Sequence, residues 1–119
     1  MYEVRGITDE VTTCDCCGKK NLKSAVILSN EAGEIVYFGS ECAAAATTGR
    51  AKNRKDGEMI KTRATAISAY YRQIAAGKTV EEAAYYVRQR GLGTIDVHPK
   101  WGVRLMIAVK GYTATYQTL

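Results

Sequence analysis

Short apolar runs in the first forty residues predict β-strands. Residues 25–29 (Ala-Val-Ile-Leu-Ser) and 34–38 (Glu-Ile-Val-Tyr-Phe) are rich in β-branched and aromatic side chains, and a four-residue connection that ends in Gly33 separates them. Two such runs around a short connection with glycine are typical of a β-hairpin. Residues 4–11 predict a further short strand ahead of this hairpin.

Helical spacing of apolar residues begins after the hairpin. Ser40 stands where a helix N-cap is expected, and the alanines behind it predict a helix that ends near residues 47–49. Residues 50–56 are polar and basic, so we interpret them as a loop or as the start of the next helix. In residues 57–76 apolar side chains recur every three or four positions, and Gly77 is suited to the C′ position. This pattern predicts a second, longer helix.

A third helix is predicted from its capping residues. Thr79 is followed three positions later by Glu82, which is the capping-box pattern, and an apolar face follows before Gly91. A loop is expected from Gly91 to Gly102. Residues 103–110 then alternate between the two faces of a strand, and a second strand over 112–117 would complete a C-terminal hairpin.

These elements together predict a small α+β fold. A chain of 119 residues and 13.0 kDa fits one domain, residues 1–119, with residues 1–49 as a metal-binding part and 50–119 as a basic, mainly helical part. No apolar run approaches the roughly 18 residues of a membrane-spanning helix, and the first residues lack a signal-peptide pattern. We therefore expect a cytoplasmic protein with no membrane partner.

The charges are segregated along the chain. The net charge is +5, yet residues 1–49 hold 4 basic and 7 acidic side chains, whereas residues 50–119 hold 13 basic and 5 acidic ones. A basic half of this kind indicates a polyanionic or acidic partner, with solubility alone as the plain alternative.

The cysteines favour a metal site over disulfides in a reducing compartment. Cys14 and Cys17 are separated by two residues, a gap that lets a tight turn direct two thiolates at one tetrahedral ion, and Gly18 permits the backbone that follows the second ligand. Cys42 lies in the first turn of a predicted helix, where the helix dipole favours the thiolate. These three residues predict a zinc site.

The chain presents first the tight turn with Cys14 and Cys17, then a β-hairpin, and then a helix that carries the ligand Cys42. This order resembles the treble-clef class of zinc fingers. The segment from Cys14 to Ala43, which contains Phe38-Gly39-Ser40-Glu41-Cys42-Ala43, also resembles small, mostly uncharacterised phage and prophage proteins. The resemblance implies a metal-stabilised fold and names no activity. In a standard treble clef the helix supplies a second ligand three or four residues after the first, but here Ala45 and Ala46 occupy those positions.

The fourth ligand must therefore come from elsewhere, or the position stays open. Cys16 is local but is adjacent to Cys17, and neighbouring side chains in a knuckle tend to point apart. His98, the single histidine, lies in a predicted loop, and we predict it as the fourth ligand. The motifs of zinc deaminases and zinc proteases are missing from the sequence, so we expect a structural Zn²⁺.

Basic side chains cluster between residues 50 and 63, in a polar connection expected to lie outside the core. This predicted partner-binding segment comprises Arg50, Lys52, Arg54, Lys55, Lys61 and Arg63. Such groups contact phosphates or an acidic protein surface in many complexes. The plain alternative is that they only keep an exposed loop soluble. The tyrosine pairs at 70–71 and 85–86, together with Trp101, suggest either core packing or an interface.

We therefore expect a non-enzymatic, zinc-stabilised binding module with no small-molecule substrate. The resemblance to phage proteins implies a host protein or nucleoprotein complex as the partner, such as a CRISPR nuclease that the module docks on and blocks. The first alternative is direct DNA or RNA binding through residues 50–63. The second is an enzyme that uses Cys16 or Cys42 as a nucleophile with His98.

Overall fold

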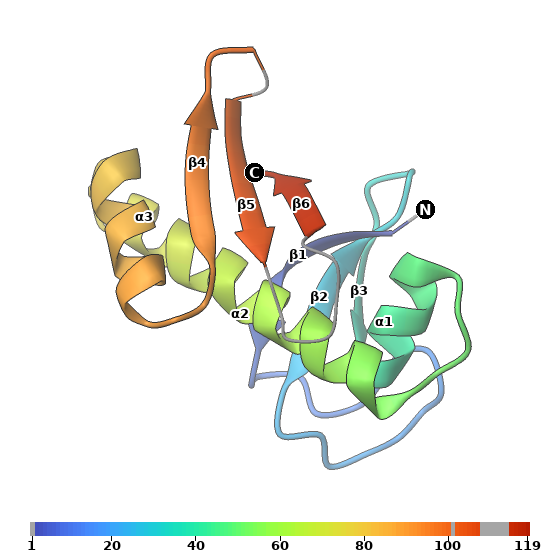
Figure 1. Cartoon of the computed structure of the whole chain (residues 1–119). Coiled ribbons are helices and arrows are strands. Elements are labelled where there is room, and N and C mark those ends of the chain that lie inside the picture. Colours follow the sequence, from blue (N-terminus) through green and yellow to red (C-terminus); the bar gives the residue numbers. More distant parts are fainter. Residues whose placement is uncertain (1, 101, 108–114) are drawn as a thin grey trace. The chain divides into compact units, whose positions relative to one another are not determined.

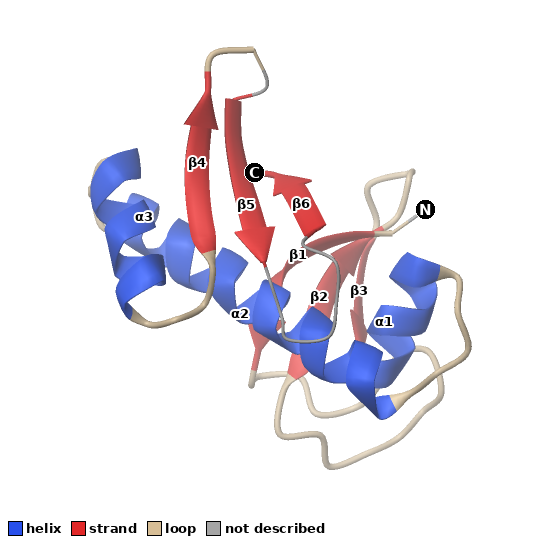
Figure 2. Ribbon diagram, viewed as in Figure 1, coloured by secondary structure: helices blue, strands red, loops and turns tan. Residues whose placement is uncertain are grey.

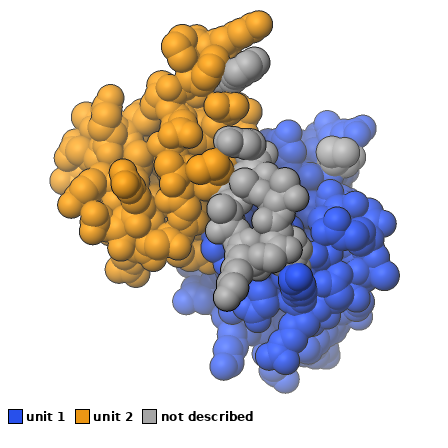
Figure 3. All heavy atoms as spheres, viewed as in Figure 1, with its two compact units in different colours: residues 1–64 blue, residues 65–119 orange. Residues whose placement is uncertain are grey.

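The computed structural model describes residues 2–100, 102–107 and 115–119. In this part of the chain, three helices and two three-stranded antiparallel sheets form an α+β fold, as predicted (Figures 1 and 2). The chain divides into two compact units, residues 1–64 and 65–119, which Figure 3 shows in different colours. Among the described residues, no helix is long and apolar enough to cross a membrane.

The sheet of the first unit contains β1 (Glu3–Thr8), β2 (Ala25–Ser29) and β3 (Ile35–Phe38) in that order. The predicted hairpin is confirmed, because β2 pairs with β3 in an antiparallel register that includes Leu28 opposite Val36. The central strand β2 is the most deeply buried of the three, as expected for a strand with neighbours on both sides. Buried apolar side chains of this sheet are Val4, Ala25, Val26, Leu28 and Phe38.

Helix α1 (Ser40–Thr48) follows β3 directly and packs on β2 and β3. The predicted N-cap is displaced by one residue: Gly39 is the cap, no side chain caps the helix, and Ser40 is already helical. Cys42, Ala43 and Ala44 are buried on the packed face. Alanine side chains are short, so the helix can lie close to the sheet and bring Cys42 near the loop before β2.

Helix α2 (Arg54–Ala75) begins three residues earlier than the sequence pattern predicts. Asn53 explains the early start, because its Oδ1 accepts a hydrogen bond from the Asp56 N–H at 2.8 Å and its Nδ2 donates to the Asp56 carboxylate at 2.8 Å. A side chain that satisfies an otherwise unpaired N–H of the first turn stabilises a helix start. At the other end Gly77 adopts a left-handed φ of +87°, as its predicted C′ role requires.

Helix α3 (Val80–Gln89) belongs to the second unit. The predicted capping box is confirmed: the Glu82 N–H donates to the Thr79 hydroxyl, and the Thr79 N–H donates to the Glu82 carboxylate. Ala83 and Val87 are buried on the inner face. The helix ends two residues before Gly91.

The second sheet consists of β4 (Thr94–His98), β5 (Gly102–Ile107) and β6 (Thr115–Thr118) in sequential order. The prediction of a loop from Gly91 to Gly102 is wrong, because β4 forms there and pairs antiparallel with β5. Three of its five residues are Thr, Ile and Val, which favour strands. The parts of the two predicted strands that fall on residues 108–110 and 112–114, and Trp101, lie outside the described residues.

Candidate metal centre

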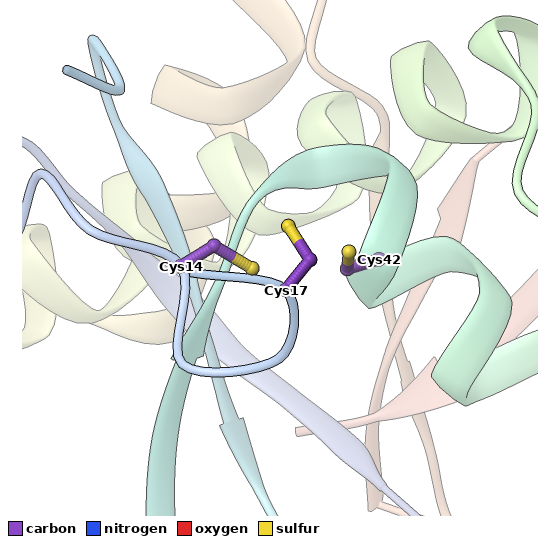
Figure 4. A group of neighbouring side chains, drawn as sticks. All are labelled: Cys14, Cys17 and Cys42. Carbon is purple, nitrogen blue, oxygen red and sulfur yellow. The ribbon is translucent and has the colours of Figure 1, made fainter. Parts of the chain in front are cut away.

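Three cysteine sulfur atoms converge in the first unit. Cys14 and Cys17 lie on the loop before β2, and Cys42 lies near the start of α1 (Figure 4). The three Sγ atoms lie within 4.8 Å of one another. Thiolates on one tetrahedral zinc ion are separated by about 3.8 Å, given Zn–S bonds of about 2.3 Å. A small inward movement would therefore let these thiolates hold one metal ion.

Backbone hydrogen bonds fold the loop between the first two cysteines. The Cys14 N–H donates to the Lys19 carbonyl and the Gly18 N–H donates to the Cys14 carbonyl, both at 2.9 Å. Gly18 adopts a φ of +78°, a conformation that glycine adopts without strain. The tight turn expected from the two-residue spacing is thus present.

Asp15 anchors this loop to the sheet, a role that the sequence analysis missed. Its N–H donates to the Tyr37 carbonyl at 2.8 Å, and its carboxylate accepts from the Tyr37 N–H at 2.9 Å. These two bonds fix the loop against β3, directly before the helix that carries Cys42. No spacing rule predicts them, because the two residues are 22 positions apart in the sequence.

Backbone amides favour the thiolate form of Cys14. Burial raises the pKa of its thiol, but hydrogen bonds from the backbone N–H groups of Cys17, Gly39 and Cys16 outweigh burial and lower the pKa to about 7. The Gly39 amide lies 3.2 Å from the Cys14 Sγ. N–H groups directed at a sulfur stabilise its negative charge whether or not a metal is bound.

The pKa of the Cys42 thiol is shifted in the opposite direction, upward. Burial, followed by its interactions with the sulfur atoms of Cys17 and Cys14, raises the pKa of the Cys42 thiol to about 12. A third thiol near a thiolate is itself held protonated by like charge and desolvation. A divalent cation at the centre would reverse this preference, because it neutralises the thiolates that repel one another.

Lys52 contacts the centre, although the sequence analysis places it in the partner-binding segment. Its Nζ lies 3.8 Å from the Cys42 Sγ. The negative charges of Cys42 and then Cys17 raise the pKa of the Lys52 ammonium. A cation at this position offsets the net negative charge that three or four thiolates leave on a zinc ion.

The two candidates for a fourth ligand lie in different units. Cys16 is exposed and does not belong to the group of three sulfur atoms within 4.8 Å, and its side-chain hydrogen bond is the smallest of the causes that raise the pKa of Cys42. His98 is the last residue of β4, and its Nδ1 accepts a hydrogen bond from the Lys100 N–H at 3.0 Å. Its role as a ligand stays a prediction.

A hollow of about 140 Å³ lies beside the centre. Its lining includes the three cysteines, Leu22 and Lys52. Pockets for drug-sized ligands span about 300–1,000 Å³. The hollow is thus smaller than a typical small-molecule site.

The other basic residues between 50 and 63 have varied surroundings. Arg54, Lys55 and Lys61 are exposed on α2. Arg63 is partly buried, and desolvation lowers the pKa of its guanidinium. The exposed lysines and arginine of this helix therefore remain the residues of the segment best placed to meet a partner.

Arg50 has a structural contact instead. Its Nε and Nη2 donate to the two carboxylate oxygens of Asp56, each at 3.0 Å. The side chain of Asp56 is only 6% exposed. A two-pronged guanidinium–carboxylate contact fixes the connection between α1 and α2, although the Arg50 side chain itself stays 59% exposed, outside the core as expected.

No protein-family model, curated protein or solved structure matches this chain. The comparisons therefore assign it to no family.

Proposed function

We propose that this chain is a non-enzymatic binding module whose first unit is stabilised by a structural zinc ion. The observation that carries the proposal is the convergence of the Cys14, Cys17 and Cys42 sulfur atoms within 4.8 Å. Cys16, the fourth cysteine of the same unit, supplies the fourth thiolate in this proposal. Sulfur-rich tetrahedral sites are characteristic of structural zinc.

The cysteine chemistry supports a structural role over a catalytic one. A nucleophilic cysteine needs a lowered pKa and access to its substrate. Cys14 has a pKa lowered to about 7 but is only 2% exposed, and Cys42 is 5% exposed with a thiol pKa raised to about 12. The adjacent hollow, at about 140 Å³, is also small for a substrate. These features support binding rather than catalysis as the function of this chain.

We favour a protein partner over nucleic acid. Arg50 and Lys52 are engaged with Asp56 and the Cys42 sulfur, which reduces the number of cations in the segment that can reach phosphates. Tyr71 and Tyr85 are 44% and 65% exposed, and exposed tyrosine is enriched in protein interfaces. A host nuclease complex such as a CRISPR effector is the partner hypothesis, and it depends on the resemblance of residues 14–43 to small phage proteins.

The test is capture of a partner on the immobilised full-length chain from a lysate of the host cell, with and without nuclease treatment. The proposal predicts a captured protein that survives nuclease and is retained when the salt concentration rises from 50 to about 200 mM. Binding through six or more phosphates would weaken by about 10³-fold or more over that range. Capture that disappears after nuclease treatment would instead support the nucleic-acid alternative.

A further inference from the structure

The acidic side chains of the second unit gather on one face. Residues 65–119 contain seven basic and only three acidic side chains. All three acids, Glu81, Glu82 and Asp96, line two hollows on α3 and β4. One hollow, of about 430 Å³, lies along α3 between residues 78 and 89. The other, of about 330 Å³, lies between α3 and β4.

The second hollow follows the outer edge of β4. Three consecutive residues of β4, Thr94 to Asp96, line it together with Glu81, Ala84, Tyr85 and Arg88 of α3. Successive side chains of a strand point to opposite faces, so a hollow lined by consecutive residues runs along the edge of the strand. Among the described strands, β4 pairs with β5 alone. Its other edge therefore presents backbone groups that another strand can pair with.

Two carboxylates lie beside this edge, those of Glu81 and Asp96. Among the described residues, neither the Glu81 nor the Asp96 carboxylate makes a hydrogen bond or ion pair, although Arg88 lines the same hollow and Arg104 lies opposite Asp96 on β5; Glu82 is held in the capping box with Thr79. Tyr85 lines both hollows, as Glu81 does, and is 65% exposed. A carboxylate beside an open tyrosine ring is complementary to a lysine or arginine side chain, through charge and through cation–π attraction.

We propose that the groove between α3 and the outer edge of β4 binds an extended, basic segment of a partner protein. The segment adds a strand to β4 through main-chain hydrogen bonds, and its Lys or Arg side chains meet Glu81 and Asp96. Strand addition of this kind obtains affinity from the backbone and specificity from the side-chain pockets. The inference rests on the proposed function only in taking the partner to be a protein. It does not depend on the metal.

The test uses a random twelve-residue peptide library displayed on phage and selected on the full zinc-loaded chain. We expect extended peptides in which Lys or Arg alternates with apolar residues. The double variant Glu81→Lys/Asp96→Lys should weaken the tightest synthetic peptide by about tenfold or more, because attraction becomes repulsion. The double variant Glu10→Lys/Glu58→Lys makes the same charge change at two exposed positions of the first unit and should have no effect. Replacing the basic residues of the peptide by Glu should restore binding to the double variant.

Strand addition is tested on the peptide backbone. Methylation of successive amide nitrogens should abolish binding at alternate positions, because only every second N–H of an added strand faces β4. Failure to select any peptide, equal binding by the double variant, or tolerance of methylation at every position would overturn the inference.

If the lysate partner binds the double variant as well as the unmodified chain, the groove is excluded while the proposed function stands. Nuclease-sensitive capture would instead exclude the proposed protein partner.

Discussion

The thiol pKa values of the two buried cysteines of the centre, Cys14 and Cys42, are shifted in opposite directions. Three backbone N–H groups lower the pKa of Cys14 to about 7, whereas burial and neighbouring sulfur atoms raise the pKa of Cys42 to about 12. The loop therefore presents a thiolate before any metal arrives. A metal must displace the proton of Cys42, and this couples metal binding to pH.

This difference predicts the pH dependence of the metal-free chain. The Cys14 pKa in the fold lies below the ordinary value of 9.0, so its contribution to stability is complete above about pH 9 and is lost as the pH falls through 7. Cys42 contributes little slope below about pH 8, because its thiol is mostly protonated there in both the folded and the unfolded state. Urea unfolding of the chelator-treated, reduced chain should show stability falling between pH 9 and 7. An equal slope in Cys14→Ser would contradict the assignment.

The fourth ligand is tested by comparing two substitutions. If Cys16 completes the site, Cys16→Ser should lower the affinity for zinc at least about tenfold, measured by competition with a chromogenic chelator. His98→Ala should leave the affinity unchanged. The reverse result would show that His98 is the ligand, as the sequence analysis predicts, and would remove Cys16 from the centre.

At the scale of elements, the connection from α1 to α2 is a small folded structure in its own right. Asn53 caps α2, and Arg50 holds the buried carboxylate of Asp56 from the opposite side. Gly57 lies close to α1: a Cβ there would lie 2.9 Å from Glu41 Cγ and 3.3 Å from its backbone nitrogen. The start of α2 is therefore fixed beside the helix that carries Cys42.

Charge reversal at Arg50 should destabilise the fold. Arg50→Glu removes the guanidinium from Asp56 and places a like charge beside it, which should cost about 1–3 kcal/mol of unfolding free energy. Arg54→Glu is the matched control, because Arg54 is exposed, and it should stay within about 0.5 kcal/mol. Chemical denaturation of both variants measures the difference. Equal stability would show that the ion pair contributes nothing.

The sequence predicts those elements whose signals are local. The hairpin of β2 and β3 and the capping box of Thr79 and Glu82 depend on residues close together in the chain, and the structure confirms both. The sequence pattern does not reveal strand β4, because the strand is only five residues long and lies between glycines and a proline. Its formation depends on pairing with β5, which short-range patterns do not reveal.

For the candidate metal centre too, the sequence predicts what depends on local spacing and misses what depends on the tertiary fold. Cys14, Cys17 and Cys42 follow from their spacing and from the predicted elements, whereas the contacts of Asp15 with Tyr37 and of Lys52 with Cys42 join residues that only the tertiary fold brings together. Lys52 shows the difference most clearly. Its position in a basic run indicates a partner-binding residue, and its surroundings indicate a counter-charge to the thiolates.

At the scale of the whole molecule, a metal ion bound by the three cysteines would compensate for the small size of the first unit. A unit of 64 residues contains a limited hydrophobic core, and such small units commonly need a metal or disulfides for stability. All four cysteines, which lie in the described part of the chain, are free thiols. A metal ion held by Cys14, Cys17 and Cys42 would join the loop before β2 to the start of α1, in addition to the hydrogen bonds between Asp15 and Tyr37.

The most direct test of the account is the metal content of the chain purified without chelator or added metal. Elemental analysis should find about one zinc per chain, as one tetrahedral site requires. Cys42→Ser should lose the zinc and more than about 4 kcal/mol of stability, because the binding energy of a structural metal is also folding energy. A folded chain that contains no transition metal, and whose melting temperature does not change with a chelator, would contradict the account.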